Sequence, residues 1–209
     1  MLFSTLGQAC PAPVAGLMVS DQNEALLSSS LERFVQIGAN GIVQTRQIKG
    51  TRPRHGDPEQ DANHAAELVF SDKDRAENVM IVDLLRNDLG RACQPGSIQV
   101  PQLVGLESYA SVHHLTSVVE GQLQAELSWV DLLEASWPGG SISGAPKLRA
   151  CQRLHELELT SRGPYCGSLL RIDWDGSFDS NILIRSLLRQ GDTLRAHAGC
   201  GIVADSDPL

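Results

Sequence analysis

Alternation of apolar and polar residues in the first and last quarters of the chain predicts short antiparallel strands. The runs are separated by turns rich in glycine, asparagine and aspartate, which is typical of hairpins. These turns lie at residues 21–23, 38–41, 175–176 and 190–192. The strands expected around them are residues 12–20, 25–37, 42–48, 165–174, 178–188 and 194–204.

The middle of the chain has apolar residues at a spacing of three to four, which predicts helices. Ser71 and Asp74 form a variant of the capping box before the longest of them. The elements expected here are helices at residues 57–70 and about 72–89, strands at 98–104 and 111–123, a helix at 129–137 and a helix that ends near Leu157. Strands and helices that do not alternate regularly indicate an α+β fold with antiparallel sheets and flanking helices.

Composition limits the class of protein and its partners. The 209 residues are 42% apolar, enough for a core, and no linker or repeat divides them, so we expect a single domain. The net charge of −8 argues against nucleic acid or an anionic membrane as partner. The chain shows neither a signal peptide nor an apolar run near the ~18 residues of a membrane span. Five scattered cysteines without CxxC spacing indicate free thiols in a reducing compartment. We therefore expect a cytoplasmic protein.

A glycine-rich loop at residues 138–147, with the sequence PGGSISGAPK, precedes the last predicted helix. Its glycines, Gly140 among them, let the backbone approach a ligand closely, and serines such as Ser141 offer hydroxyl groups. A helix that begins in such a loop presents free N–H groups to an anion. The loop matches neither GxxxxGK[ST] nor GxGxxG, so a tight turn without a ligand is the alternative.

Lys49 is a candidate nucleophile at the end of a predicted strand. It is one of only three lysines among 17 basic residues, and Arg46, Arg52 and Arg54 are its neighbours in sequence. Apolar and cationic surroundings favour the neutral form of an amine, which is the form that acts as a nucleophile. A solvated lysine at a strand end is the alternative.

Glu77 is a candidate metal ligand on the long helix. Met80, Ile81 and Leu84 follow it at helical spacing, which places a carboxylate on an apolar stripe. A buried carboxylate needs a cation or several donors, and Mg²⁺, which prefers oxygen ligands, would satisfy it. A salt bridge to an arginine is the alternative.

Three further segments contain residues that could bind a charged group or transfer a proton. His113 and His114 alternate along a strand, so at most one of them faces a given site, where it could act as acid or base. Arg185 stands in an apolar strand, where it should meet an acidic group or bind a carboxylate. Gly199 and Gly201 offer bare backbone N–H groups to an anion, or mark a bulge. A small di-acid bound with Mg²⁺ would unite these features.

Several stretches together resemble one known family. From about residue 11 to 207, the sequence is similar to the chorismate-utilising enzymes, which include the component I subunits of anthranilate synthase and aminodeoxychorismate synthase. The resemblance implies the family's β-sandwich fold, chorismate as substrate and Mg²⁺ as cofactor. The stretches are IKGTRPR at 48–54, KDRAEN at 73–78, IVDL at 81–84, RND at 86–88, HHL at 113–115, the glycine-rich loop and GCGIVADS at 199–206.

Lys49 indicates the branch of the family. Aminodeoxychorismate synthases typically have lysine at the matching position, whereas anthranilate synthases and isochorismate-type enzymes have alanine. The resemblance implies that Lys49 attacks C2 of chorismate as the C4 hydroxyl leaves, and that ammonia then adds at C4 and expels the lysine. The product is 4-amino-4-deoxychorismate, the precursor of p-aminobenzoate and folate.

Other roles also follow from matching positions. The resemblance makes Glu32 a general acid, His114 the catalytic histidine beside the leaving hydroxyl, and Glu77 a Mg²⁺ ligand. It assigns the enolpyruvyl carboxylate to Tyr165 and Arg185, and the ring carboxylate to the backbone around Gly199 and Gly201. A separate glutamine amidotransferase subunit would supply ammonia.

The chain also departs from the family pattern. Leu31 and Gln47 stand where proline is usual, so local strand geometry should differ slightly. Family members have a further N-terminal half, and a second cluster of Mg²⁺-binding glutamates lies beyond the Asp205-Ser206 motif. We therefore expect a partial catalytic domain with a weak metal site and little turnover by itself. Anthranilate synthase and a non-catalytic chorismate-binding module are the alternative functions.

Overall fold

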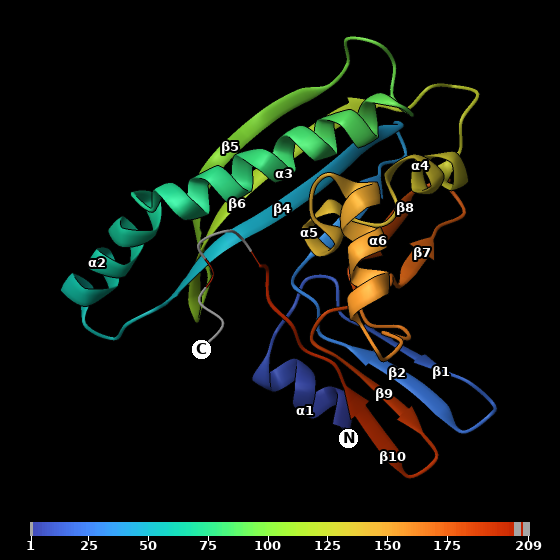
Figure 1. Ribbon diagram of the computed structural model, residues 1–209, viewed down its shortest axis with the longest axis horizontal. Coiled ribbons are helices and arrows are strands. Elements are labelled where there is room, and N and C mark those ends of the chain that lie inside the picture. Colours follow the sequence, from blue (N-terminus) through green and yellow to red (C-terminus); the bar gives the residue numbers. More distant parts are fainter. Residues whose placement is uncertain (1, 203–205, 207–209) are drawn as a thin grey trace.

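The computed structural model describes residues 2–202 and 206 of the protein. These residues form two antiparallel sheets with flanking helices, which confirms the predicted α+β class (Figure 1). The larger sheet has the order β5 (Gln99–Ser108), β6 (Val112–Gln122), β4 (Ile42–Pro53), β3 (Arg33–Ile37), β8 (Phe178–Asn181) and β7 (Leu170–Ile172). The smaller has the order β1 (Gly16–Val19), β2 (Glu24–Ser28), β9 (Ser186–Gln190) and β10 (Thr193–Ala196).

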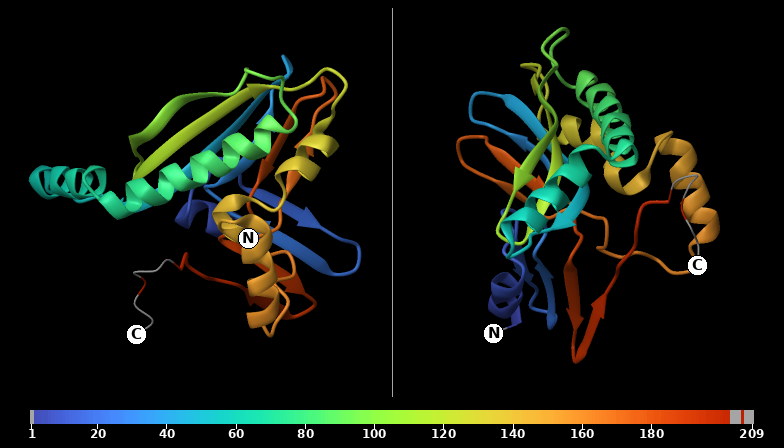
Figure 2. Two further views of the ribbon diagram at one scale, coloured as in Figure 1. Left: turned by 45° about the horizontal axis from the view of Figure 1, so that its top comes forward. Right: turned by 90° about the vertical axis from the view of Figure 1, so that its left-hand side faces the viewer.

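The helix α3 lies along one side of the larger sheet, where α4 and α5 pack against it (Figure 2). The predicted cap of α3 is confirmed, since the Ser71 side chain accepts a hydrogen bond from the Asp74 backbone N–H. None of the described helices has the length and apolarity needed to cross a membrane. The helices are α1 (Leu2–Ala9), α2 (Pro58–Val69), α3 (Asp72–Gly90), α4 (Trp129–Ser136), α5 (Gly140–Ser143) and α6 (Lys147–Leu157).

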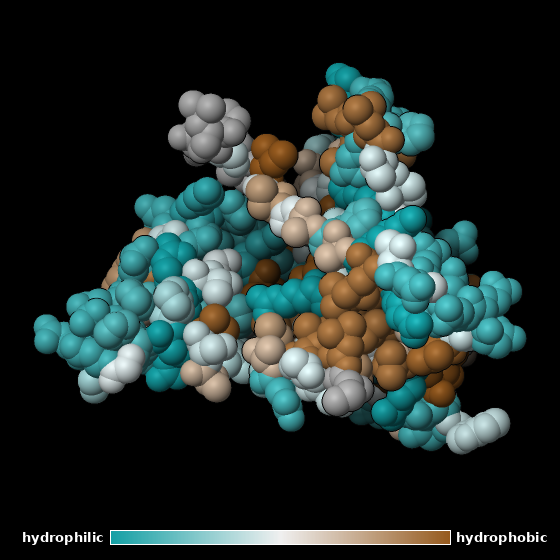
Figure 3. All heavy atoms as spheres, turned by 90° about the horizontal axis from the view of Figure 1, so that it is seen from below, coloured by the Kyte–Doolittle hydropathy of each residue, from teal (hydrophilic) through white to brown (hydrophobic). Residues whose placement is uncertain are grey.

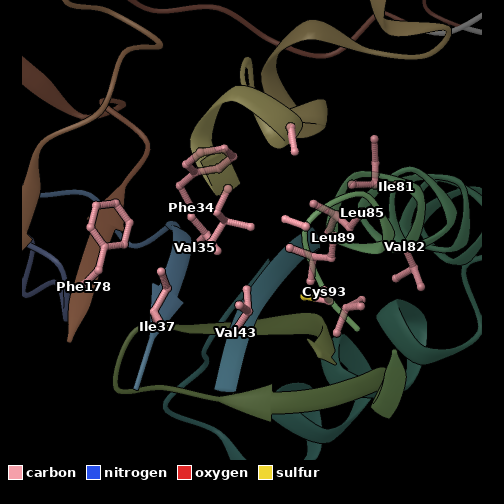
Figure 4. Packing of buried hydrophobic residues seen from close by; sticks show 14 of the residues in the cluster. Phe34, Val35, Ile37, Val43, Ile81, Val82, Leu85, Leu89, Cys93 and Phe178 are labelled. Atoms are coloured by element: carbon pink, nitrogen blue, oxygen red, sulfur yellow. The ribbon is translucent and has the colours of Figure 1, made fainter. Parts of the chain in front are cut away.

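The hydrophobic core fills the space between α3 and the larger sheet (Figure 4). Each such side chain stabilises the fold by about 1.5–3 kcal/mol on burial. A polar link crosses the same interface, because the Asn78 amide donates to the Leu115 carbonyl (3.3 Å) and accepts from the Ser117 hydroxyl (2.5 Å). Core side chains from α3 are Ile81, Val82, Leu85 and Leu89, and those from the sheet include Phe34, Val35, Val43, Val119 and Phe178.

Two predicted strands are wrong, because each is split between the two sheets. Residues 25–37 form β2 and β3, and residues 178–188 form β8 and β9. The chain crosses from one sheet to the other at residues 29–32 and again at 182–185. These two crossings lie side by side, since the Ser29 N–H donates to the Arg185 carbonyl (3.1 Å) and the Ile182 N–H donates to the Glu32 carbonyl (3.0 Å).

Other strand bounds differ as well. β4 continues through Pro53 because Gly50, with φ +79°, forms a bulge that preserves pairing with β6. The strands expected at 12–20, 165–174 and 194–204 are reduced to β1, β7 and β10, and positions 203–204 lie outside the described residues. The helix α1 was not predicted. All five cysteines are free thiols, as expected.

Candidate active site

A cleft opens between the glycine-rich loop and the first crossing. Glu32 lies on that crossing, Gln47 projects from β4, and Gly140 and Ser141 begin α5. The surface is also hollowed when the molecule is viewed from below, and apolar side chains border the hollow (Figure 3). The cleft is lined by Glu32, Arg33, Phe34, Thr45, Gln47, Leu85, Gly139, Gly140, Ser141 and Ile182.

Glu32 is the acidic group of this cleft. Burial raises the pKa of its carboxyl group, while a hydrogen bond from the Ser141 hydroxyl and the positive charge of Lys49 act in the opposite direction. The net shift is upward, so the carboxyl group keeps its proton to higher pH than an exposed glutamate. A protonated carboxyl group beside a cleft is able to act as a general acid.

Lys49 lies on β4 directly before the Gly50 bulge, and its charge reaches Glu32. Within the described residues, Lys49 forms no ion pair. Each of the three arginines near Lys49 in the sequence pairs with a carboxylate, which offsets its positive charge. The pairs are Arg46 with Glu107 (2.6 Å), Arg52 with Glu67 (2.9 Å) and Arg54 with Asp61 (2.8 Å).

Lys147, at the end of the glycine-rich loop, has a structural role. Its ammonium group donates to the Asp88 carboxylate and to the Ser136 carbonyl, both at 2.7 Å. Asp88 is buried near the end of α3, so this pair ties the start of α6 to α3. These contacts thus anchor the loop to the core at the end of the loop that lies away from the cleft.

Gly140 is required for close packing of the loop against α3. A Cβ atom at this position would overlap the Leu84 side chain, whose Cγ would be 3.1 Å away. We expect Gly140→Ala to lower the free energy of unfolding by about 1–3 kcal/mol, as overpacking does. Urea denaturation followed by circular dichroism measures this loss.

Two further variants test that explanation. Gly90→Ala is the matched control, because a Cβ atom on this helical glycine meets nothing within 4 Å. Leu84→Ala should remove most of the effect of Gly140→Ala when the two changes are combined. Strict additivity of the two changes would contradict the steric explanation.

His113 and His114 point to opposite faces of β6, as alternation predicts. The His113 ring contacts Asp61 of α2 through Nε2 (3.1 Å) and Ser108 through Nδ1 (2.8 Å), which gives it a structural role. On the other face, His114 Nδ1 lies 2.8 Å from the Thr51 hydroxyl, and its Nε2 is buried without a partner among the described atoms. Thr51 could not be identified from sequence, because the contact depends on the register of β4 and β6.

The imidazole of His114 is neutral near pH 7. Burial lowers its pKa most, and the charges of Arg185 and His113 lower it further, whereas the Gly50 backbone and the Glu107 carboxylate act to raise it. A neutral ring with Nε2 unpartnered is able to accept or donate one hydrogen bond to a ligand. The ring tautomer determines which of the two occurs, and the Thr51 hydroxyl at Nδ1 is compatible with both tautomers because it can donate or accept.

The predicted carboxylate-binding residues form two groups. Arg185 is exposed on the second crossing, at φ +48°, and its charge reaches His114. Within the described residues it has no acidic partner, which leaves it available for a carboxylate ligand. Tyr165 lies beside Gly199, where a Cβ atom would be 3.1 Å from the phenol oxygen. Gly199 and Gly201 lie in an irregular segment after β10, not in a strand, and Gly201 is exposed.

Glu77 is partly exposed on α3, next to the buried Asn78. The apolar stripe predicted around it is incomplete, because Ile81 is buried but Met80 is 44% exposed. Among residues 2–202 and 206, no group of three or more His, Cys, Asp or Glu side chains is placed to hold a metal ion. These residues therefore do not form a Mg²⁺ site by themselves, and Glu77 as a ligand stays a prediction.

The fold and these residues match one class of protein. The sequence agrees with the family described as chorismate binding enzyme over residues 1–209, and the chain belongs to this family. It is 50% identical over 205 residues to aminodeoxychorismate synthase component 1 of Klebsiella aerogenes, covering 98% of this chain and 45% of the relative. It is 41% identical over 207 residues to anthranilate synthase component 1 of Saccharolobus solfataricus, covering 99% of this chain and 49% of the relative.

Solved structures agree with the fold. Anthranilate synthase component I from Streptococcus pneumoniae superimposes with a TM-score of 0.88 at 36% identity, over 98% of this chain and 45% of that one. The family resemblance and the antiparallel α+β fold are therefore confirmed. The chain spans about half the length of the curated relatives that it matches.

Proposed function

We propose that this chain is the chorismate-binding part of an aminodeoxychorismate synthase component I, which converts chorismate and ammonia to 4-amino-4-deoxychorismate. The observation that carries the proposal is the proximity of Lys49 to Glu32, because the charge of Lys49 acts on the buried carboxyl group. Similarity to aminodeoxychorismate synthases of several organisms, at up to 50% identity, supports it.

Each reaction step is assigned to residues described above. The Lys49 amine attacks C2 of chorismate, the ring double bonds shift, and the C4 hydroxyl leaves with a proton as water. Glu32, whose pKa is raised by burial, is the proton donor for the departing hydroxyl group. Ammonia then adds at C4, the double bonds return, and the Lys49 amine leaves C2. Arg185 would hold one carboxylate of chorismate, and the backbone near Gly199 would hold the other. The Tyr165 hydroxyl would lie beside the carboxylate at Gly199.

Partner, metal and compartment complete the proposal. A glutamine amidotransferase subunit would supply ammonia, in keeping with the component 1 names of the relatives. Mg²⁺ would be held by Glu77 together with carboxylates not found among the described residues, and no step above is routed through it. The reaction would take place in the cytoplasm.

Replacing Glu32 with glutamine tests the proton donor. We expect kcat to fall by about 10²–10⁴-fold, because the amide cannot donate a proton to the leaving group. Wild-type activity should decline as pH rises through the raised pKa of Glu32, and this alkaline limb should be absent in the variant. The assay uses the full-length polypeptide that contains these residues, with chorismate, Mg²⁺ and ammonium, and liquid chromatography with mass detection.

The matched control is Glu24→Gln. Glu24 is also partly buried, but it lies on β2 and accepts a hydrogen bond from Gln190 (2.9 Å), away from the cleft. Its replacement should leave the rate and the pH profile unchanged. An unchanged rate in Glu32→Gln would refute the assigned role.

Anthranilate synthase is the second candidate, favoured by the 41% identity and by the 0.88 TM-score given above. The two activities differ in their products. Anthranilate synthesis releases pyruvate and gives a fluorescent aromatic product, whereas aminodeoxychorismate retains the enolpyruvyl group and is not aromatic. Fluorescence and pyruvate release in the same assay would favour the second candidate.

A further inference from the structure

Glu107 lies directly opposite His114 in the pairing of β5 with β6. Directly paired side chains in antiparallel strands lie on the same face at close distance. Glu107 therefore shares the face of β6 to which His114 points, whereas His113 faces α2. No role follows for Glu107 from the sequence, because the register of β5 is irregular at two places.

Glu107 is held in place by three donors. Its carboxylate accepts hydrogen bonds from the Tyr109 hydroxyl (2.8 Å), the Gln102 amide (3.0 Å) and the Arg46 guanidinium (2.6 Å). Burial alone would raise the pKa of Glu107, but these donors and the Arg46 charge outweigh it, so the pKa is lowered. The group is thus a fixed negative charge at neutral pH.

Tyr109 connects this carboxylate with the histidine. Its ring contacts the His114 ring edge to face, with the centroids 5.7 Å apart. The same ring donates its hydroxyl to Glu107. On the other side of the imidazole, Thr51 contacts Nδ1, so Nε2 is the ring nitrogen left for a ligand.

We propose that Glu107 is a positioning residue that acts through Tyr109 to hold His114 with Nε2 directed at the substrate. This inference rests on the proposed function and on the position of His114 beside the leaving hydroxyl that the family resemblance implies. The charged groups that act on His114 come from four elements. They are Glu107 on β5 with Arg46 of β4 behind it, His113 on β6 and Arg185 on the second crossing.

The first test measures the titration of His114 in this chain by NMR of the imidazole C–H signals. Replacement of Glu107 by glutamine keeps the shape but removes the charge that favours the protonated ring. We expect His114 to titrate at lower pH in Glu107→Gln than in wild type. The His114→Gln variant identifies the signal, because it removes it.

Two controls accompany this measurement. His113 faces the other side of the strand, so its ring C–H signals should keep their positions in Glu107→Gln. Glu120→Gln removes a partly buried carboxylate on β6, which accepts a hydrogen bond from Gln44 (2.6 Å). This change should leave the titration of His114 as it is in wild type. Equal His114 titration in wild type and Glu107→Gln would overturn the proposal. If Glu107→Gln does not fold, Tyr109→Phe takes its place, because this variant keeps the ring contact with His114 and loses the hydrogen bond to Glu107. An unchanged His114 titration in folded Tyr109→Phe would also overturn the proposal.

The second test is kinetic and uses the full-length polypeptide. For a histidine that binds a metal, removing its hydrogen-bonding partner lowers metal affinity or activity by roughly 10–100-fold. For Glu107→Gln we expect kcat to fall by about tenfold with KM unchanged. The acid limb of the pH profile should move to lower pH. A shifted His114 titration in a protein that forms no aminodeoxychorismate would reject the proposed function alone. Full activity with an unmoved pH profile in Glu107→Gln would reject the positioning role alone.

Discussion

Replacing Lys49 with alanine is expected to lower the formation of aminodeoxychorismate by about 10³-fold or more. The methyl group cannot form the covalent bond to C2, and what remains is binding and electrostatic stabilisation by the rest of the site. Chromatographic product assays of the full-length polypeptide with chorismate and ammonium measure this loss. Mass spectrometry of the quenched wild-type reaction should also detect chorismate, less one water, attached to the peptide that contains Lys49.

Lys73→Ala is the matched control for this prediction. Lys73 is exposed in the first turn of α3, and its removal should leave the rate unchanged. Wild-type turnover by Lys49→Ala would show that ammonia attacks without a lysine intermediate. Conversion to a fluorescent product by the variant would indicate that the cleft also supports the anthranilate reaction once the amine is absent.

Replacing Lys147 with methionine should destabilise the fold by about 3 kcal/mol. The Asp88 side chain is only 5% exposed, and loss of its partner leaves a buried charge without compensation. Urea denaturation at pH 7, followed by circular dichroism, measures the effect. Lys73→Met is the matched control and should change stability by less than about 0.5 kcal/mol.

The loss in Lys147→Met should depend on pH. Burial raises the pKa of Asp88 above 3.8 even though Lys147 and Arg91 act to lower it, and removal of Lys147 raises it further. The native variant therefore holds a proton that the unfolded chain releases, so its stability increases as pH falls toward the unfolded pKa. Partial recovery in Lys147→Met/Asp88→Asn at pH 7 would agree with this explanation. Equal losses at pH 5 and pH 7 would contradict it.

Local signals in the sequence are enough for α2, α3, α4 and α6 and for some side-chain directions, but not for α1 or the short α5. Ser71 and the helical spacing that follows it fixed the start of α3, and alternation placed His113 and His114 on opposite faces. The split strands failed because their residues remain apolar while the chain changes sheets. Only pairing between distant segments, such as Ser29 with Arg185, shows where each strand ends.

The candidate site was predicted less completely, for the same reason. Family resemblance gave Glu32 and Lys49 roles, but the hydrogen bond from Ser141 to Glu32 joins segments that no local pattern relates. The arginines near Lys49 are cationic neighbours in the sequence, but their carboxylate partners on α2 and β5 become visible only in the folded chain. Lys147 was one of three notable lysines, and its partner Asp88 became visible only in the folded chain.

The paired crossings determine the order in which the site can form. Glu32 is synthesised early, but its crossing gains its hydrogen-bonding partners only when residues 182–185 are available. Closing such long loops is slow, because their entropy must be lost before the contacts form. A nascent chain that stops before β8 therefore contains Lys49 and Glu32 without the cleft that relates them. We expect a chain that ends before β8 to bind no chorismate, because its cleft lacks Ile182 of the second crossing.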